Sequence, residues 1–293
     1  MSSIQSLPCY LNGEFSTLDK ANISVMDRGF IFGDGIYEVV PVYGGRPFRF
    51  DEHMGRLERS LAEIRIPNLL TREGWRDLVG QLVERHAKSV GQAVNSLNQL
   101  IYIQVTRGVA MRDHAMPADI KPTIFAMVNN LKAVPPADLE NGVQCVSEED
   151  FRWKKAHIKS TSLLGAVLSR QISADVGATE TIMFREGYLS EAAASNVWVV
   201  KDGKVFGPPK DNLVLEGIRY GLVAELCQQD GLPFELRKIT QAEVLDADEL
   251  MLSSATKELL PVTRLDERAV GSGRPGPVFK RLYARYQQAK AAS

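Results

Sequence analysis

The chain has 293 residues, of which 44% are hydrophobic and 24% are charged. Because single domains usually hold about 100–200 residues, we expect two domains, or one large one, of ordinary globular composition. Lys and Arg together number 35 and Asp and Glu 36, so no bulk charge draws the chain to nucleic acid or to an anionic membrane. We therefore expect no nucleic-acid partner and no membrane partner.

The three cysteines, Cys9, Cys145 and Cys227, are widely separated and form no CxxC pattern. This argues against a metal site and favours a reducing compartment. The N-terminal residues MSSIQSLPCYLNGEF lack the pattern of a signal peptide, and no run of about 18 apolar residues occurs. The sequence therefore predicts a cytoplasmic protein.

The first part of the chain mixes strand-like and helical patterns. Runs of β-branched and aromatic residues predict strands at residues 36–43, 100–106 and 123–128. Apolar residues at helical spacing predict a helix over residues 51–64 and a second one around residues 75–83. We expect an α+β domain here.

A polar segment with paired prolines, NNLKAVPPAD at residues 129–138, predicts the domain boundary. We therefore expect a small α+β domain of residues 1–130, a linker of residues 131–136 and a larger domain of residues 137–293. For the larger domain the patterns predict a strand at 142–147, a helix at about 162–176, a hairpin turn at Asp202-Gly203, a helix at 217–229, a strand at 249–252 and a basic C-terminal helix from Val278.

Lys159 is the first candidate for chemistry. Most lysines are solvated surface charges, but this one follows a short extended run and precedes Ser160, Thr161 and Ser162, which are natural helix caps. An amine held in such a place forms Schiff bases well when its surroundings lower its pKa toward neutrality.

Two further segments could bind a cofactor. Glu191 lies in a tight run of small residues before an apolar strand, where a carboxylate could keep a pyridine nitrogen protonated. An exposed turn is the alternative. Gly217 opens an amphipathic helix whose free N–H groups could bind a phosphate, although glycines are common at helix starts.

In this order the segments resemble the fold-type IV pyridoxal-phosphate aminotransferases, most closely the D-amino-acid aminotransferases. The resemblance rests on MDRGFIFGDGIYEVV from Met26, EHMGRL from Glu52, QVTRG from Gln104 and IKS from Ile158, followed by Glu191, Asn196-Val197 and Gly217-Ile218. It covers roughly residues 4–265 and implies a two-domain α+β member of the α/β class.

The resemblance also implies roles for the cofactor-binding residues. Lys159 would form the internal aldimine with pyridoxal 5'-phosphate and would carry the proton during catalysis, and Glu191 would pair with the pyridinium nitrogen. Arg56 would bind the phosphate through a charge-assisted contact. The other expected members of the phosphate cup are the amides of Gly217 and Ile218, with Ser254 and Ala255.

The loop RGVAMRDH from Arg107 bears on the substrate. In the D-amino-acid enzymes a corresponding Arg-x-His pair traps the substrate carboxylate together with a tyrosine, and Arg112, His114 and Tyr37 fit that pattern. Two solvated loop charges are the alternative. The branched-chain enzymes would carry an arginine where this chain has Pro41, which disfavours that interpretation.

Three departures from the family pattern concern the phosphate cup. Arg219 stands where a small hydroxyl residue is usual, Ala255 replaces a hydroxyl residue, and Ala192 to Ala194 replace a stretch rich in Gly and Ser. Arg219 would either compensate by its own charge or point outward.

The resemblance thus implies ping-pong transamination of D-amino acids with a 2-oxo acid such as pyruvate or 2-oxoglutarate. It also implies a homodimer, with the loop of Arg112 and His114 completing the neighbour's site. The alternatives of the same fold are a branched-chain or (R)-amine transaminase and an aminodeoxychorismate lyase. A catalytically inactive binding protein is the alternative outside enzymology, which the presence of Lys159 and Glu191 disfavours.

Overall fold

The computed structural model describes residues 6–292, and contacts between residues divide the chain into two units. The first unit runs to Lys132 and includes Ile158–Leu163, and the second comprises Ala133–His157 and Leu164–Ala292. The expected boundaries at 130 and 137 stay a prediction. The segment of Lys159 groups with the first unit, whereas we expected it in the larger domain, because its backbone bonds to a strand of that unit.

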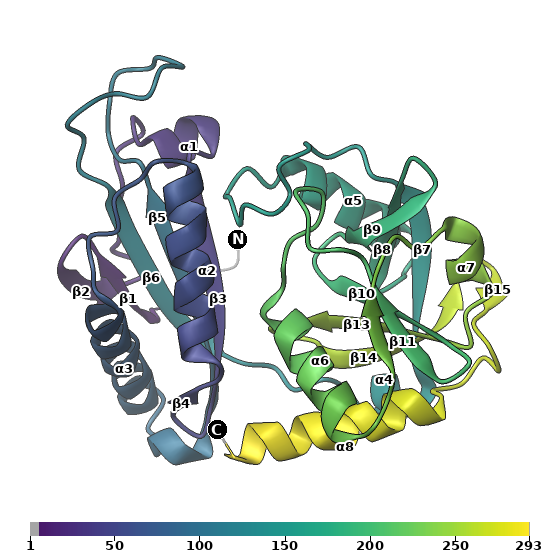
Figure 1. Ribbon diagram of the computed structural model, residues 1–293. Coiled ribbons are helices and arrows are strands. Elements are labelled where there is room, and N and C mark those ends of the chain that lie inside the picture. The colour runs from purple at the N-terminus through teal and green to yellow at the C-terminus, as the bar shows by residue number, and fades with distance from the viewer. Residues whose placement is uncertain (1–5, 293) are drawn as a thin grey trace. The chain divides into compact units, whose positions relative to one another are not determined.

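The first unit is a six-stranded sheet with helices (Figure 1). Its strands follow the order β2-β1-β6-β5-β3-β4, and neighbours are antiparallel throughout. The elements are β1 (Pro8–Leu11), β2 (Glu14–Thr17), α1 (Arg28–Phe32), β3 (Gly35–Tyr43), β4 (Arg46–Pro47), α2 (Phe50–Glu63), α3 (Arg72–Ser89), the 3-10 helix η1 (Val94–Ser96), β5 (Asn98–Thr106) and β6 (Thr123–Asn130).

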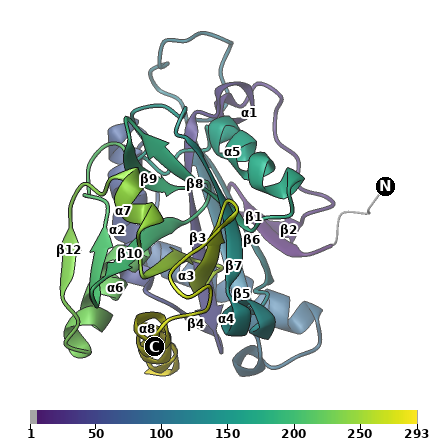
Figure 2. The same ribbon diagram turned by 90° about the vertical axis from the view of Figure 1, so that its right-hand side faces the viewer.

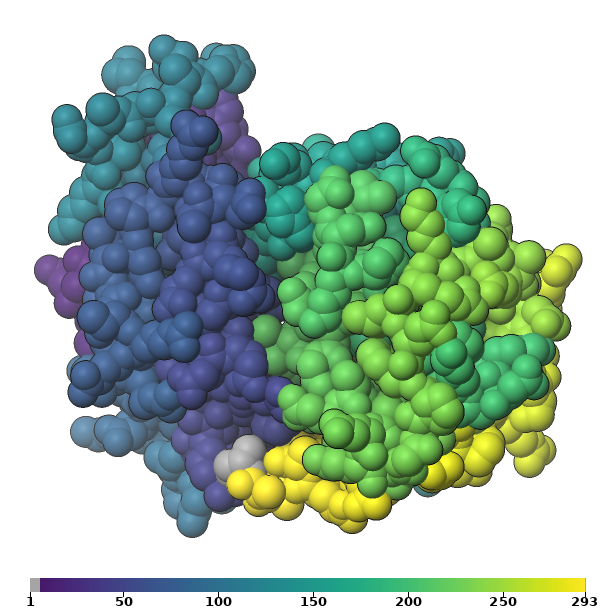
Figure 3. All heavy atoms as spheres, in the orientation of Figure 1, coloured from purple at the N-terminus to yellow at the C-terminus, as the bar shows by residue number. Residues whose placement is uncertain are grey.

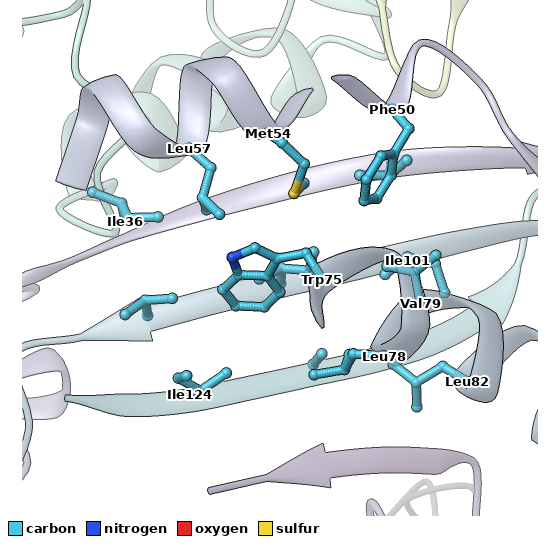
Figure 4. Close-up of a cluster of buried hydrophobic side chains, with 14 of the residues drawn as sticks. Ile36, Phe50, Met54, Leu57, Trp75, Leu78, Val79, Leu82, Ile101 and Ile124 are labelled. Carbon is cyan, nitrogen blue, oxygen red and sulfur yellow. The ribbon is translucent and has the colours of Figure 1, made fainter. Parts of the chain in front are cut away.

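One face of this sheet forms the core of the first unit. Successive side chains of a strand point to opposite faces, and in β5 the buried residues Ile101, Ile103 and Val105 alternate with half-buried ones. Helices α2 and α3 cover the buried face with Met54, Trp75 and other apolar side chains (Figure 4). The opposite face of β3 and β5 therefore carries Tyr37 and Tyr102.

A long loop joins β5 to β6. It extends beyond the end of the sheet beside α1 (Figures 1 and 3). Its first residues bond to the segment before and at the start of α1, since the Arg28 N–H donates to the Gly108 carbonyl at 2.9 Å and the Ala110 N–H to the Met26 carbonyl at 3.3 Å. The loop and α1 thus form one local substructure.

The second unit is built on a nine-stranded mixed sheet (Figure 2). The strand order is β12-β11-β10-β13-β14-β7-β8-β9, with β15 on β14, and three neighbouring pairs are parallel. The elements are α4 (Pro136–Asn141), β7 (Val143–Glu149), α5 (Leu164–Asp175), β8 (Glu180–Arg185), β9 (Tyr188–Ala192), β10 (Asn196–Lys201), β11 (Lys204–Gly207), α6 (Ile218–Gln229), β12 (Phe234–Leu236), α7 (Gln241–Leu245), β13 (Glu249–Ser254), β14 (Glu258–Leu265), β15 (Arg268–Ala269) and α8 (Pro277–Ala292).

The secondary structure follows the sequence patterns closely. The strands predicted at 36–43, 100–106 and 123–128 are confirmed as β3, β5 and β6, and the predicted helix at 51–64 is α2. In the second unit the predicted hairpin, the helix at 217–229 and the C-terminal helix are confirmed as β10–β11, α6 and α8. Tight turns at Asp202 and Gly203, both with positive φ, make the hairpin possible.

Candidate active site

Lys159 is held in the first unit by backbone hydrogen bonds to β3. The Tyr37 N–H donates to the Lys159 carbonyl at 3.0 Å, and the Thr161 N–H donates to the Gly35 carbonyl at 2.9 Å. The Lys159 N–H donates to the hydroxyl of Ser60 on α2 at 3.3 Å. The lysine therefore stands on a fixed backbone, as its position before three capping residues suggested.

The side chain of Lys159 meets an aromatic pair. Its Nζ lies 4.1 Å from the centre of the Tyr37 ring, and Tyr37 stacks on Tyr102 with ring centres 5.7 Å apart. The Tyr102 hydroxyl donates to Gln104 at 2.7 Å, and burial raises the pKa of Tyr102 to about 12. Tyr102 is thus a neutral, fixed support for Tyr37 at neutral pH.

Arg56, expected at the cofactor phosphate, is buried in the first unit. Its Nε and Nη2 donate to the two oxygens of Glu38 at 2.7 and 2.9 Å. His53 shares that carboxylate at 2.7 Å through Nδ1. Burial alone would raise the pKa of Glu38, but the charge and hydrogen bonds of Arg56 outweigh burial and hold this pKa well below its usual range. The phosphate contact of Arg56 stays a prediction.

Arg112 and His114 lie together on the exposed loop between β5 and β6. Both side chains approach one aromatic ring, that of Phe32 at the end of α1. The guanidinium carbon of Arg112 is 5.4 Å from the ring centre, and the His114 ring centre is also 5.4 Å away. The expected pair is therefore gathered around one residue.

Glu191, in the second unit, is a buried carboxylate near the end of β9. It accepts from Arg152 Nη1 at 2.8 Å, from the Leu215 N–H at 3.3 Å and from Asn196 Nδ2 at 3.4 Å. The alternative of an exposed turn is wrong, since Glu191 is only 5% exposed.

Arg152 divides its charge between two acids. Its Nε and Nη2 donate to Asp150, each at 2.9 Å, and only Nη1 turns to Glu191. Burial raises the pKa of Glu191 to about 7, although the charge of Arg152 works in the opposite direction. Glu191 therefore has an incomplete share of positive charge and is suited to a further cationic partner.

The N-terminus of α6 lies next to the Glu191 cluster. Gly217 is the residue before the helix and no side chain caps it, so backbone N–H groups of the first turn are available to an anion. A Cβ at Gly217 would lie 1.9 Å from Asn196 Oδ1, and Asn196 itself donates to the Leu215 carbonyl at 2.9 Å. Glycine is therefore required where Asn196 joins the helix start to Glu191.

Arg219 does not point outward, so that alternative is wrong. It is 2% exposed, and its Nη2 donates at 3.0 Å to the hydroxyl of Tyr286 on α8. Its contribution to a phosphate cup stays a prediction. In the other expected part of the cup, the Ser254 hydroxyl accepts from the Lys257 N–H at 3.0 Å, and Ala255 is half-buried beside it.

Several residues of these clusters were missed in the sequence. Arg152 lies in the run FRWKK, a pattern typical of an exposed basic turn. Its partner Glu191 is 39 residues away in the chain. Glu38 shares the buried face of β3 with apolar residues. A charged residue at such a position is unusual, and this could have identified Glu38 from the sequence. Phe32 offered no signal of its own.

Neither a membrane span nor a metal site is found in the described part of the chain. No helix within residues 6–292 has the length and apolar character needed to cross a membrane. Over the same residues, no three His, Cys, Asp or Glu side chains gather in a group that could hold a metal ion.

The sequence relatives and the solved structures that resemble this chain are all aminotransferases. A D-alanine aminotransferase from Staphylococcus haemolyticus is 38% identical over 275 residues, which span 93% of this chain and 94% of that protein. One from Bacillus licheniformis is 35% identical and spans 94% of both.

A branched-chain amino acid aminotransferase from Escherichia coli superposes with a TM-score of 0.87 at 24% identity, covering 97% of this chain and 94% of that one. Another, from T.th. and solved with pyridoxamine 5'-phosphate, has a TM-score of 0.88 at 21% identity, covering 99% and 95%. At these identities the superpositions show the fold, which is the two-domain fold expected. Residues 35–265 match the family described as Amino-transferase class IV, and the chain belongs to that family.

Proposed function

We propose that this aminotransferase uses pyridoxal 5'-phosphate to move the amino group of D-amino acids to a 2-oxo acid such as pyruvate or 2-oxoglutarate. The observation that carries the proposal is the pairing of Arg112 and His114 around Phe32, because two adjacent donors on one loop suit a planar carboxylate. The D-alanine aminotransferases among its relatives support the same substrate class.

The residues present fit this cofactor. Glu191 is a buried carboxylate whose charge Arg152 balances only in part, so it can pair with a pyridinium. The uncapped start of α6 offers backbone N–H groups to a phosphate. When bound, the cofactor ring acts as an electron sink for the negative charge that develops at the substrate α-carbon. Lys159 would hold the cofactor through its amine, and its Nζ, freed when the substrate amine takes its place, would take the proton from that α-carbon.

The remaining expected residues position the two reactants. Glu191 keeps the ring nitrogen protonated. Arg56 binds the phosphate together with the amides of Gly217 and Ile218 and the segment of Ser254 and Ala255. Tyr37, Arg112 and His114 bind the substrate carboxylate, so the same contacts serve the amino donor in the first half-reaction and the 2-oxo acid in the second.

We also propose a homodimer in which the loop of Arg112 and His114 serves the neighbouring subunit. Helix α5 supports this, because its apolar side chains face solvent while its serines face the sheet. Leu164, Val167 and Leu168 are 72%, 58% and 51% exposed, whereas Ser169 and Ser173 are fully buried. An exposed apolar helix face of this kind is typical of a protein interface.

A cytoplasmic location is part of the proposal. It is supported by Cys9, Cys145 and Cys227, all of which are buried free thiols. Isolation of the protein from fractionated cells tests this location directly, and recovery from a secreted fraction would contradict it.

The test of the activity is the near-visible absorption spectrum of the protein loaded with pyridoxal 5'-phosphate, before and after addition of D-alanine, L-alanine or L-leucine. We expect D-alanine, but not L-alanine or L-leucine, to change the cofactor band, and to yield more than one equivalent of pyruvate per site only as long as a 2-oxo acid acceptor regenerates the enzyme. A change with L-leucine alone would indicate a branched-chain enzyme. Continued release of pyruvate without any acceptor would indicate a lyase.

Two lysine variants separate chemistry from folding. Lys159→Ala should abolish turnover, because the amine that holds the cofactor and moves the proton is removed. Lys155→Ala, four residues earlier and exposed, is the matched control and should retain turnover. Substantial transamination by Lys159→Ala would show that another residue moves the proton.

A further inference from the structure

We propose that Phe32 is a positioning residue that holds Arg112 and His114 in the orientation that binds the substrate carboxylate. In the same proposal, Arg28 and Asp34 fix the loop backbone from which these two side chains project. The inference rests on the proposed function, because it concerns how the carboxylate-binding pair is prepared.

The ring of Phe32 has three neighbours that carry or can carry positive charge. Arg28 lies 4.8 Å from the ring centre on the side of α1, and Arg112 lies 5.4 Å from it on the side of the loop. The His114 ring meets it at an interplanar angle of 43° with centres 5.4 Å apart. Cations favour the negative face of an aromatic ring, so Phe32 restricts both donors without consuming their N–H groups.

Arg28 ties the loop backbone to α1. It is 4% exposed, and its Nη1 donates to the carbonyl of Asp113 at 2.5 Å. Asp113 is the residue between Arg112 and His114, so this one contact sets the backbone position of both. The Arg28 Nε in turn donates to Asp34 at 2.7 Å, which fixes the direction of the guanidinium group.

Asp34 joins the middle of the loop to its base. It accepts from Arg28 and also, at 2.7 and 3.0 Å, from Nε and Nη2 of Arg107, the residue that follows β5. Arg107 is anchored further by donating to the Ile64 carbonyl at 2.6 Å. Burial would raise the pKa of Asp34, but the two arginines outweigh burial and lower it, so the acid is charged at neutral pH.

The rest of the loop offers less support. Val109, Ala110 and residues 117–122, together with Asn12 and Thr123, line a cavity of about 420 Å³. The base of the loop is tightly packed there: Gly108 has a φ of +104°, and a Cβ on it would lie 2.1 Å from the Lys121 carbonyl. The contacts with α1 are therefore the ones that determine where Arg112 and His114 point.

This arrangement predicts an effect on binding more than on the chemical step. Free Arg and His side chains on an exposed loop lose rotamer freedom when they bind a carboxylate, and prior restriction reduces that loss. Both substrates, the D-amino acid and the 2-oxo acid, carry a carboxylate. Removing the ring should therefore raise KM for both and leave kcat nearly unchanged.

The experiment compares Phe32→Leu with Phe15→Leu in the loaded enzyme. Phe15 lies on β2 with the guanidinium carbon of Arg85 at 4.1 Å from its ring centre, so its variant removes the same type of contact away from the loop. We expect Phe32→Leu to raise KM for D-alanine and for pyruvate by about three- to tenfold, and Phe32→Tyr to restore it. Phe15→Leu should leave both values as in the wild type.

A double variant tests whether Phe32 acts through Arg112. In an Arg112→Ala background, Phe32→Leu should raise KM by a smaller factor than in the wild type, since one of its two targets is gone. If Arg112→Ala alone leaves KM unchanged, the proposed carboxylate role is wrong. If Arg112→Ala raises KM but Phe32→Leu leaves it unchanged, or the two effects simply multiply, the positioning role alone is wrong.

A second variant guards against a fold defect in Phe32→Leu. Arg28→Lys keeps a positive charge near Asp34 but lacks the fork that reaches Asp34 and the Asp113 carbonyl together. It should also raise KM for both substrates while the cofactor band stays as in the wild type. Unchanged KM in this variant would contradict the anchoring of the loop by Arg28.

Discussion

Each unit buries a carboxylate against an arginine, but the two clusters divide their charge differently. In the first unit, Glu38 accepts two hydrogen bonds from Arg56 and is also hydrogen-bonded to Nδ1 of His53. In the second unit, Glu191 receives a single N–H of Arg152, whose other two donors go to Asp150.

The difference in charge supply has opposite effects on the two acids. Both are buried, and burial alone would raise both pKa values. The partners of Glu38 outweigh burial and lower its pKa, whereas those of Glu191 do not, and its pKa rises to about 7. A saturated acid, meaning a buried carboxylate whose charge is fully balanced by positive partners, stabilises the fold. A buried carboxylate whose charge is only partly balanced can bind a cationic ligand.

The largest expected effect is on the stability of the first cluster. Glu38→Gln should lower the free energy of unfolding by about 3–5 kcal/mol, because it leaves the buried guanidinium of Arg56 without its counter-charge. Urea unfolding of the cofactor-free protein at neutral pH measures the loss. A change below about 1 kcal/mol would show that Glu38 is not the saturated structural acid described here.

Glu191→Gln should reduce activity and not stability. It should lower kcat by about 10²–10³-fold, the usual cost of losing one electrostatic partner of developing charge. At pH 8 its free energy of unfolding should be unchanged or increased, because a raised pKa makes the ionised acid a cost to the folded state above about 7. A loss of stability with unchanged kcat would reverse the roles of the two clusters.

Arg152→Gln tests how the second cluster is tuned. Glu191 must be ionised to pair with a pyridinium, so cofactor affinity should rise with pH as Glu191 ionises, near pH 7. Loss of the Arg152 charge should raise that pKa further and move the rise in affinity up by at least about one pH unit. The affinity is measured by titration of cofactor absorbance between pH 6 and 9.

Arg185→Gln is the matched control for this shift. Arg185 also pairs with Asp150, at 3.0 Å, but it reaches the Arg152 carbonyl rather than Glu191. Its variant should move the affinity profile much less. Equal shifts in the two variants would mean that general loss of positive charge, and not the contact of Arg152 with Glu191, sets the pKa.

Local patterns predicted most of the elements because they record which face of each element is buried. The alternation in β5 and the helical spacing in α2 depend only on neighbours in the chain. Helix α5 shows the limit of this reasoning. Its apolar stripe predicted a helix correctly, but the stripe faces solvent, because a pattern defines a face without saying what covers it.

The clusters around the expected site residues were beyond such patterns. Family resemblance predicted roles for Lys159 and Glu191, whereas no pattern in the sequence pointed to Arg152 or Phe32. Arg152 and Glu191 are 39 residues apart in the chain, and the fold also brings Phe32 and Arg112 together from distant parts of the sequence. Charge balance in a buried cluster is a property of long-range packing, and one sequence does not reveal it.

His86 supplies a third case, a buried ionisable group beside a neutral partner, and the smallest expected effect. Its ring is fully buried on α3, and its Nδ1 accepts from the Gln99 amide at 2.9 Å. Burial lowers the pKa of His86 from its usual 6.5. Protonation would both charge a buried ring and set a new donor against the amide group.

Because the folded-state pKa of His86 lies below the unfolded one, the unfolded chain binds the proton first as the pH falls. The stability that neutral His86 contributes is therefore present above pH 6.5 and is lost below it, at up to about 1.4 kcal/mol per pH unit. In His86→Leu the free energy of unfolding should fall less between pH 7.5 and pH 5.5 than in the wild type. Equal falls in the two proteins would mean that burial without a charged partner does not control this histidine, and that the contrast between Glu38 and Glu191 cannot be extended to it.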